Sequence, residues 1–159
     1  MNKTSFDFRG VTLIDKTIEG DLAHIKKYFS YRKVSKKSLC VIEERGYPNF
    51  YIFHTAVFYG HANVVQYLIW KNREVVNFVD LDGSTGLHHA AATGRIRMAK
   101  MLMESGSDIR TLNQKKKTAA DVANENGHYH LATILTSRWC GLEWFSKPPP
   151  HSNLIVNSV

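Results

Sequence analysis

The stretch Gly83-Ser-Thr-Gly-Leu-His-His-Ala-Ala-Ala-Thr-Gly94 predicts the fold, because its residue types return at a fixed interval along the chain. Its threonine, first alanine and final glycine return 33 positions later, at Thr118, Ala123 and Gly127. Its histidine, alanine and glycine also occur 34 positions earlier, at His54, Ala56 and Gly60. A weaker echo surrounds Gly20. A period of this length is typical of proteins built from stacked supersecondary units.

The residues of one unit predict two short helices. Thr85 precedes the first helix and is well placed to cap it. Ala90 and Ala91 are small where two helices must approach closely, and Gly94 ends the first helix where a left-handed residue is favoured. Apolar side chains then recur at helical spacing and form a buried stripe: Ile96, Met98, Ala99, Leu102 and Met103. No unit covers its own faces, so its neighbours must do so.

These units resemble the ankyrin repeat. The third reads DLDGSTGLHHAAATGRIRMAKMLMESGSDI, from Asp80 to Ile109, and shorter matches cover 53–69 and 117–135. The resemblance implies an all-α solenoid of stacked helix-turn-helix units with short β-hairpin fingers. Gly86 departs from the family, which usually has proline there, and we expect a slightly weaker helix start. The fourth finger, 113–117, lacks the turn glycine, and the second, 44–52, is not recognisable.

The repeats divide the whole chain. Residues 1–40 are predicted to be an N-terminal capping repeat with a basic arm, because Lys16 stands where the small alanine belongs. Residues 41–76 and 77–110 are predicted ankyrin repeats, and 111–137 a terminal one. Residues 138–159 are predicted to form an aromatic cap followed by a disordered tail that contains prolines.

Composition indicates a soluble globular protein. The 159 residues are 43% hydrophobic and 22% charged, without a run of apolar residues long enough for a membrane span. Cys40 and Cys140 make no disulfide framework, which favours a reducing compartment and a cytoplasmic location. Three lysines at 115–117 resemble a minimal nuclear-import patch and are equally typical of a solvated finger. The net charge of +7 lies mainly in the N-terminal arm, where nucleic-acid binding is the weaker alternative.

The sequence gives little sign of catalytic or metal chemistry. His88 and His89 are adjacent, but neighbours on a helix point in different directions and do not converge on one ion. The resemblance explains His54, His61, His88 and His128 as scaffold residues, whereas His89 occupies a variable position. Nucleophile elbows, phosphate-binding loops and dinucleotide fingerprints are absent from the sequence. We therefore expect a non-catalytic chain without cofactors or metal.

Recognition of another protein is the remaining function. In ankyrin folds the finger tips and the exposed side of each first helix line a concave surface. Those positions and a nearby aromatic segment give thirteen candidates: Tyr47, Phe50, Tyr51, Phe58, Tyr59, Leu81, Asp82, Ser84, His89, Thr93, Gln114, Lys115 and Lys117. Phe58 and Tyr59 are predicted to be a hydrophobic anchor, because aromatic side chains dominate binding energies. The alternative is that Phe58 packs against the second finger.

In size and layout the chain is similar to the vankyrins, short IκB-like ankyrin proteins of parasitoid-wasp viruses. This resemblance implies that a monomer masks a Rel-type transcription factor and suppresses host immune signalling. The degradation signal of IκB proteins, D-S-G-x-x-S, has no match, since Glu104-Ser-Gly-Ser-Asp-Ile109 lacks the last serine. We expect an inhibitor that signalling cannot remove. The alternative is a targeting or substrate-recruiting arm of a larger protein or enzyme complex.

Overall fold

The computed structural model describes residues 13–31, 42–44, 47–50 and 52–142, with backbone only for 31, 42–44, 47–50 and 138–142. Residues 1–12, the basic stretch within 32–41, Tyr51, and the tail from 143 onward lie outside the described residues. The elements follow in the order α1 (Leu13–Glu19), α2 (Leu22–Tyr31), β1 (Ile42–Glu44), β2 (Tyr47–Phe50), α3 (Ile52–Tyr59), α4 (Ala62–Lys71), η2 (Arg73–Asn77), α5 (Gly86–Ala92), α6 (Ile96–Glu104), α7 (Ala119–Glu125) and α8 (Tyr129–Leu142).

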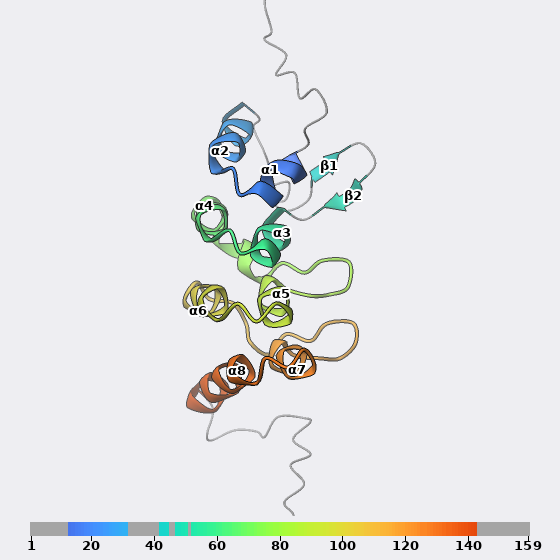
Figure 1. Ribbon diagram of the computed structural model, residues 1–159, viewed down its shortest axis with the longest axis vertical. Coiled ribbons are helices and arrows are strands. Elements are labelled where there is room, and N and C mark those ends of the chain that lie inside the picture. Colours follow the sequence, from blue (N-terminus) through green and yellow to red (C-terminus); the bar gives the residue numbers. More distant parts are fainter. Residues whose placement is uncertain (1–12, 32–41, 45–46, 51, 143–159) are drawn as a thin grey trace, which may run out of the picture.

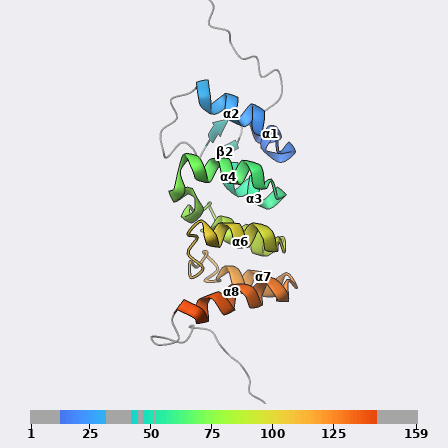
Figure 2. The same cartoon turned by 90° about the vertical axis from the view of Figure 1, so that its left-hand side faces the viewer.

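The helices form antiparallel pairs that stack in one direction, as expected for an all-α solenoid (Figure 1). The first helices of the pairs, α1, α3, α5 and α7, pack in one column, and each contacts the next. The second helices, α2, α4, α6 and α8, form a parallel column that faces the viewer in Figure 2. The loops between units project from the side of the first helices. The finger face is therefore the surface of the loops and first helices, and the outer face is that of the second helices.

The fingers differ in how much strand they contain. The second finger, which the sequence did not reveal, is a hairpin in which antiparallel β1 and β2 pair Ile42 with Phe50 and Glu44 with Tyr47. The third finger contains a single bridge between Val79 and Thr85. The predicted short hairpin fingers are thus confirmed for these two units.

One apolar cluster runs through all four units. Its largest fully buried side chains come from every helix pair: Leu13, Ile25, Ile52, Phe53, Leu68, Leu87, Leu102, Leu131 and Leu135. Met98, Ala99 and Leu102 are buried on α6, whereas Ile96 and Met103 pack at the edge of the cluster. The predicted stripe therefore faces the core, and burial of its apolar area against neighbouring units stabilises the stack.

Backward hydrogen bonds join consecutive units. The residue after the repeat glycine reaches a carbonyl near the end of the preceding unit's first helix: His61 Nε2 donates to Ile18 O over 2.6 Å, Arg95 Nε to Phe58 O over 2.9 Å, and His128 Nε2 to Ala92 O over 3.2 Å. We call His61, Arg95 and His128 the junction residues. The repeat glycine has a second role here, because a Cβ atom on Gly94 would lie 2.6 Å from His128 Nδ1. Gly94 also has φ of 66°, as predicted from the sequence.

Gly86 makes room for a large neighbour. A Cβ atom at this position would lie 2.7 Å from Cε1 of Phe53, which is fully buried in the preceding unit. Helix α5 nevertheless begins at Gly86, and Thr85 caps it together with His88. A proline at position 86 would also carry a Cβ atom, and this atom would meet the Phe53 ring.

Candidate protein-binding surface

The third finger is held rigidly by one carboxylate. Asp80 Oδ1 accepts hydrogen bonds from the backbone N–H groups of Asp82 and Ser84, over 2.9 and 2.8 Å. Its Oδ2 atom lies 2.6 Å from His89 Nε2 on α5. Partial burial raises the pKa of the Asp80 carboxyl, but the bonds from His89 and Ser84 outweigh it and hold that pKa below its usual value. The charged carboxylate therefore ties the finger to its own helix.

His89 has a partner within its own unit. Besides its bond to Asp80, its ring packs edge-on against His54 and Phe58, with centroids 5.4 and 6.4 Å apart. The side chain is only a quarter exposed. His89 thus supports the finger and the Phe58 ring, and any contact with a partner protein would involve its edge.

His54 and His88 are buried and structural. His88 Nδ1 accepts from the backbone N–H of Thr85 over 3.1 Å, so the proton lies on Nε2, which donates to Lys117 O over 3.0 Å. His54 Nε2 donates to Phe78 O over 3.0 Å. Burial lowers the pKa of both imidazoles, and it lowers that of His54 to about 4. Both rings are therefore neutral near pH 7 and connect their helix to the next finger.

The fourth finger repeats this design with an amide. Asn113 Oδ1 accepts from the backbone N–H groups of Lys115 and Lys117, over 3.0 and 3.1 Å. Lys116 takes the left-handed position that the absent glycine would fill, with φ of 59°. The Lys117 ammonium pairs with Glu125 on α7, while Lys115 is exposed.

The third and fourth fingers are tied to each other. The backbone N–H of Gln114 donates to Asp82 O over 3.0 Å, and its side-chain amide donates to Leu81 O over 2.7 Å. The Leu81 side chain itself remains 63% exposed. The two finger tips therefore form one connected edge whose backbone is already ordered.

Two adjacent aromatic rings are exposed at the end of α3. Phe58 and Tyr59 are each 44% exposed, and their rings meet edge to face with centroids 5.4 Å apart. Phe58 also contacts His89, so this aromatic pair adjoins the Asp80 network. Large exposed apolar side chains on a supported frame are typical of binding surfaces.

The remaining candidates lie at several places. Tyr47 and Phe50 are in β2, where only backbone is described, and Tyr51 lies outside the described residues. Packing of Phe58 against that finger stays an alternative. Thr93 is half-buried, and its hydroxyl donates to His89 O over 2.9 Å, which caps its own helix end. Asp82 is exposed and Ser84 half-buried on the third finger.

A second exposed cluster was not predicted from the sequence. Trp70 on α4 is 74% exposed, and its ring stacks on Tyr67 at 6.0 Å. The Lys71 ammonium lies 5.2 Å from the Trp70 ring. The string Tyr67-Leu-Ile-Trp-Lys71 could have revealed this cluster from the sequence. It places two aromatic residues in one helical turn, and Trp70 falls outside the apolar stripe of that helix.

Within the described residues, no three histidine, cysteine, aspartate or glutamate side chains are grouped so that they could hold a metal ion. None of the described helices is both long and apolar enough to cross a membrane. The chemistry visible on the described surface is that of aromatic, amide and charged side chains.

A family model for ankyrin repeats, in three copies, matches residues 53–143, which is more than half of the chain. The chain belongs to the ankyrin-repeat family. Ankyrin repeats serve as protein–protein interaction modules, and this agrees with the ordered fingers and exposed aromatic pair. The match begins at the second unit, consistent with the divergence of the first from the repeat pattern.

Parts of several proteins with different names and functions are similar to the chain. It is 29% identical over 103 residues to alpha-latroinsectotoxin-Lt1a of Latrodectus tredecimguttatus, covering 65% of the chain and 7% of the toxin. It is 37% identical over 73 residues to protein phosphatase 1 regulatory subunit 12A of Mus musculus, covering 46% of the chain and 7% of that subunit. It is 28% identical over 94 residues to NAD-capped RNA hydrolase NUDT12 of Homo sapiens, covering 58% of the chain and 20% of the hydrolase. The chain therefore spans a fifth or less of these relatives.

Proposed function

We propose that the chain is a non-catalytic binding module that masks a partner protein through its finger face, as a small inhibitor or adaptor. The observation that carries this proposal is the exposed Phe58–Tyr59 pair beside a hydrogen-bonded frame. A surface of this kind loses little conformational entropy on binding, because Asp80 and Asn113 already order the fingers. Leu81 extends the apolar area across the third finger tip.

A Rel-type transcription factor is the partner that we propose for this face. The proposal rests on the resemblance to vankyrins in size and layout. The finger face also offers the mixture of aromatic anchors and cationic rim that suits a protein partner, with Phe58 and Tyr59 exposed on α3 and Lys115 exposed on the fourth finger. We propose cytoplasmic and nuclear locations for the same reason, and suppression of host immune signalling as the outcome.

The test is titration calorimetry of the full chain with a purified Rel homology domain. Phe58→Ala with Tyr59→Ala should weaken binding roughly tenfold or more, because aromatic anchors carry much of an interface's energy. Tyr129→Ala is the matched control, since Tyr129 is 69% exposed on the outer α8 helix. It should leave the affinity unchanged.

Two results would contradict the proposal. One is an absence of binding by the unmodified chain at micromolar concentrations, which would remove the Rel-type partner. The other is a double variant whose thermal unfolding midpoint falls as much as its affinity does, since Phe58 would then be part of the fold and the loss would not report a binding surface.

A second candidate function is that of a targeting arm for an enzyme supplied by another chain or domain. The similarity to a phosphatase regulatory subunit favours it, because that relative is by its name the regulatory partner of an enzyme. Affinity purification of the chain from host cells should then recover a catalytic subunit, and the Phe58→Ala, Tyr59→Ala variant should lose it. Recovery of a transcription factor without any enzyme would favour the inhibitor.

A further inference from the structure

The outer face carries an aromatic cluster surrounded by lysines. Trp70 and Tyr67 stack on α4, the Lys71 ammonium lies 5.2 Å from the Trp70 ring, and the Lys26 ammonium of α2 lies 5.7 Å from the Tyr67 ring. Trp70 is the most exposed large hydrophobic side chain among the described residues. Neither the core nor the finger face accounts for a tryptophan in this position.

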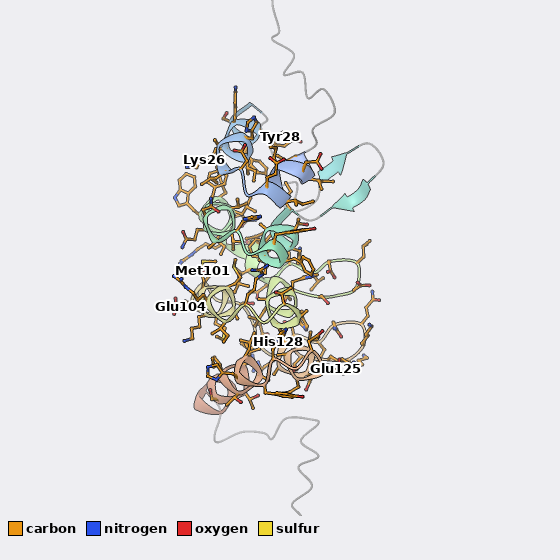
Figure 3. All side chains as sticks on the ribbon, in the orientation of Figure 1. Lys26, Tyr28, Met101, Glu104, Glu125 and His128 are labelled. Carbon is orange, nitrogen blue, oxygen red and sulfur yellow. The ribbon has the colours of Figure 1, made fainter. Side chains whose placement is uncertain are left out.

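A groove of about 760 Å³ lies between α4 and α6 on the same outer face. Ala62 and Gln66 line it on α4, and Arg97, Lys100 and Met101 line it on α6. Since residues four apart share one side of a helix, Trp70 continues the stripe of Ala62 and Gln66 at the end of the groove. Figure 3 shows Met101 and Glu104 on the outer side of α6 and Lys26 on the outer side of α2.

The cations of this groove are not paired with carboxylates. Among the described residues, no acidic side chain lies within ion-pair distance of Arg97 or Lys100. Some described acids elsewhere do have cationic or histidine partners, as Asp80 has His89 and Glu125 has Lys117. Glu104 is the one acidic side chain among the groove-lining residues. The groove is therefore positively charged, with an apolar floor that Met98 and Met101 contribute.

We propose that the outer face is a second docking surface, which binds an acidic, apolar-containing peptide segment of a partner protein. Carboxylates of the segment pair with Arg97 and Lys100, since a guanidinium binds a carboxylate with two hydrogen bonds. An apolar side chain of the segment packs on Met101 and Trp70. The groove favours a peptide over a lipid surface, because a flat bilayer would leave the recess between the two helices unfilled. The finger face lies on the other side of the stack, so both surfaces can be occupied at once (Figure 1).

The experiment uses the full chain with Trp139→Phe and Trp144→Phe, which leaves Trp70 as its single tryptophan. The probe is a synthetic peptide in which leucines alternate with pairs of glutamates. Binding should shift the Trp70 emission to shorter wavelength and saturate. Arg97→Glu with Lys100→Glu should weaken binding about tenfold, which corresponds to about 1.4 kcal/mol.

Lys115→Glu with Lys116→Glu is the matched control. It changes the net charge by the same amount on the finger face, where both lysines are exposed. It should weaken peptide binding less than the groove variant does. Equal losses in the two variants would overturn the proposal, since attraction by the net charge of +7 would then suffice. A Trp70 shift with phosphatidylserine vesicles but none with the peptide would also overturn it. Neither outcome bears on the proposed function of the finger face.

Discussion

The third and fourth units build their fingers on one frame but use different residues at its three key places. In both, a side-chain oxygen accepts two backbone N–H groups, from Asp80 in the third and Asn113 in the fourth. The left-handed position is Gly83 in one and Lys116 in the other. The threonine cap is completed by His88 in the third unit and by Asp121 in the fourth.

The difference reflects what lies next to each finger. A Cβ atom on Gly83 would lie 3.1 Å from the backbone nitrogen of Gln114. Two causes therefore disfavour a side chain at position 83: the positive φ angle and the contact with the fourth finger. Lys116 belongs to the last finger of the described residues and meets only the conformational cost. The left-handed position of a finger can thus hold a charged residue instead of glycine where no described finger packs against it. In the fourth unit this residue is the exposed Lys116.

The largest expected difference between the units concerns acid. Burial lowers the pKa of His54 to about 4 and also lowers that of His88. Below pH 6.5 these histidines become protonated in the unfolded chain but stay neutral in the folded protein, so acid favours unfolding. Stability is full above that pH and is lost as the pH falls toward 4, by about 3 kcal/mol for His54 alone. Urea unfolding across this range measures the loss.

Hydrogen exchange localises the effect of acid. Because His54 Nε2 donates to Phe78 O beside the third finger and burial lowers the His54 pKa to about 4, the amides of that finger should lose more protection at pH 5 than those of the fourth finger, which His88 joins through Lys117 O. His54→Gln should flatten the pH dependence while keeping an amide donor toward Phe78 O. Equal loss of protection in both fingers would contradict the assignment.

Giving the third finger the lysine of the fourth finger at the left-handed position tests the comparison directly. Gly83→Lys should lower the free energy of unfolding by roughly 2–3 kcal/mol, because a positive φ and a close contact with Gln114 add together. Gly127→Lys is the matched control, with φ of 78° and no described atom within 4 Å of a Cβ atom. It should cost about 1 kcal/mol. Equal costs in urea unfolding would mean that the neighbouring finger yields.

A further exchange concerns the first residue of each helix. Gly86→Ala gives α5 the residue that α7 has at Ala119, yet we expect a loss of about 1–2 kcal/mol because of Phe53. Phe53→Leu should reduce that loss when the two changes are combined. A double-mutant cycle by urea unfolding measures the coupling. Simple additivity would show that Phe53 does not restrict position 86.

The smallest expected effect is an increase in the free energy of unfolding. Lys116→Gly relieves the positive φ of the fourth finger, and the greater entropy of the unfolded chain offsets part of the gain. The urea midpoint should rise, by up to about 1 kcal/mol in free energy. Lys115→Gly, a neighbouring exposed change, should lower it. A drop for Lys116→Gly would indicate that its side chain holds the finger.

The repeat pattern predicted the stack because its signature residues are local. Thr85 caps, Gly94 takes positive φ, and both lie within one unit, so spacing alone reveals them. The second finger was invisible because a hairpin held by backbone pairing leaves no fixed residue pattern. The role of Gly86 was missed since its cause, Phe53, lies in another unit.

The candidate site was predictable in outline only. Family positions led to Phe58 and Tyr59, which are each 44% exposed, and their role in binding stays a prediction. The bond from His89 to Asp80 depends on how a finger folds back on its helix, which no periodicity reveals. The groove beside Trp70 requires the angle between two helices, and this too is set by packing.

The junction residues give the stack a direction. His61, Arg95 and His128 each donate to a carbonyl of the preceding unit, and never of the following one. During synthesis the ribosome releases the units in that same order. Each new unit therefore leaves the exit tunnel when its acceptor already exists, and docking can proceed step by step before the next unit is made.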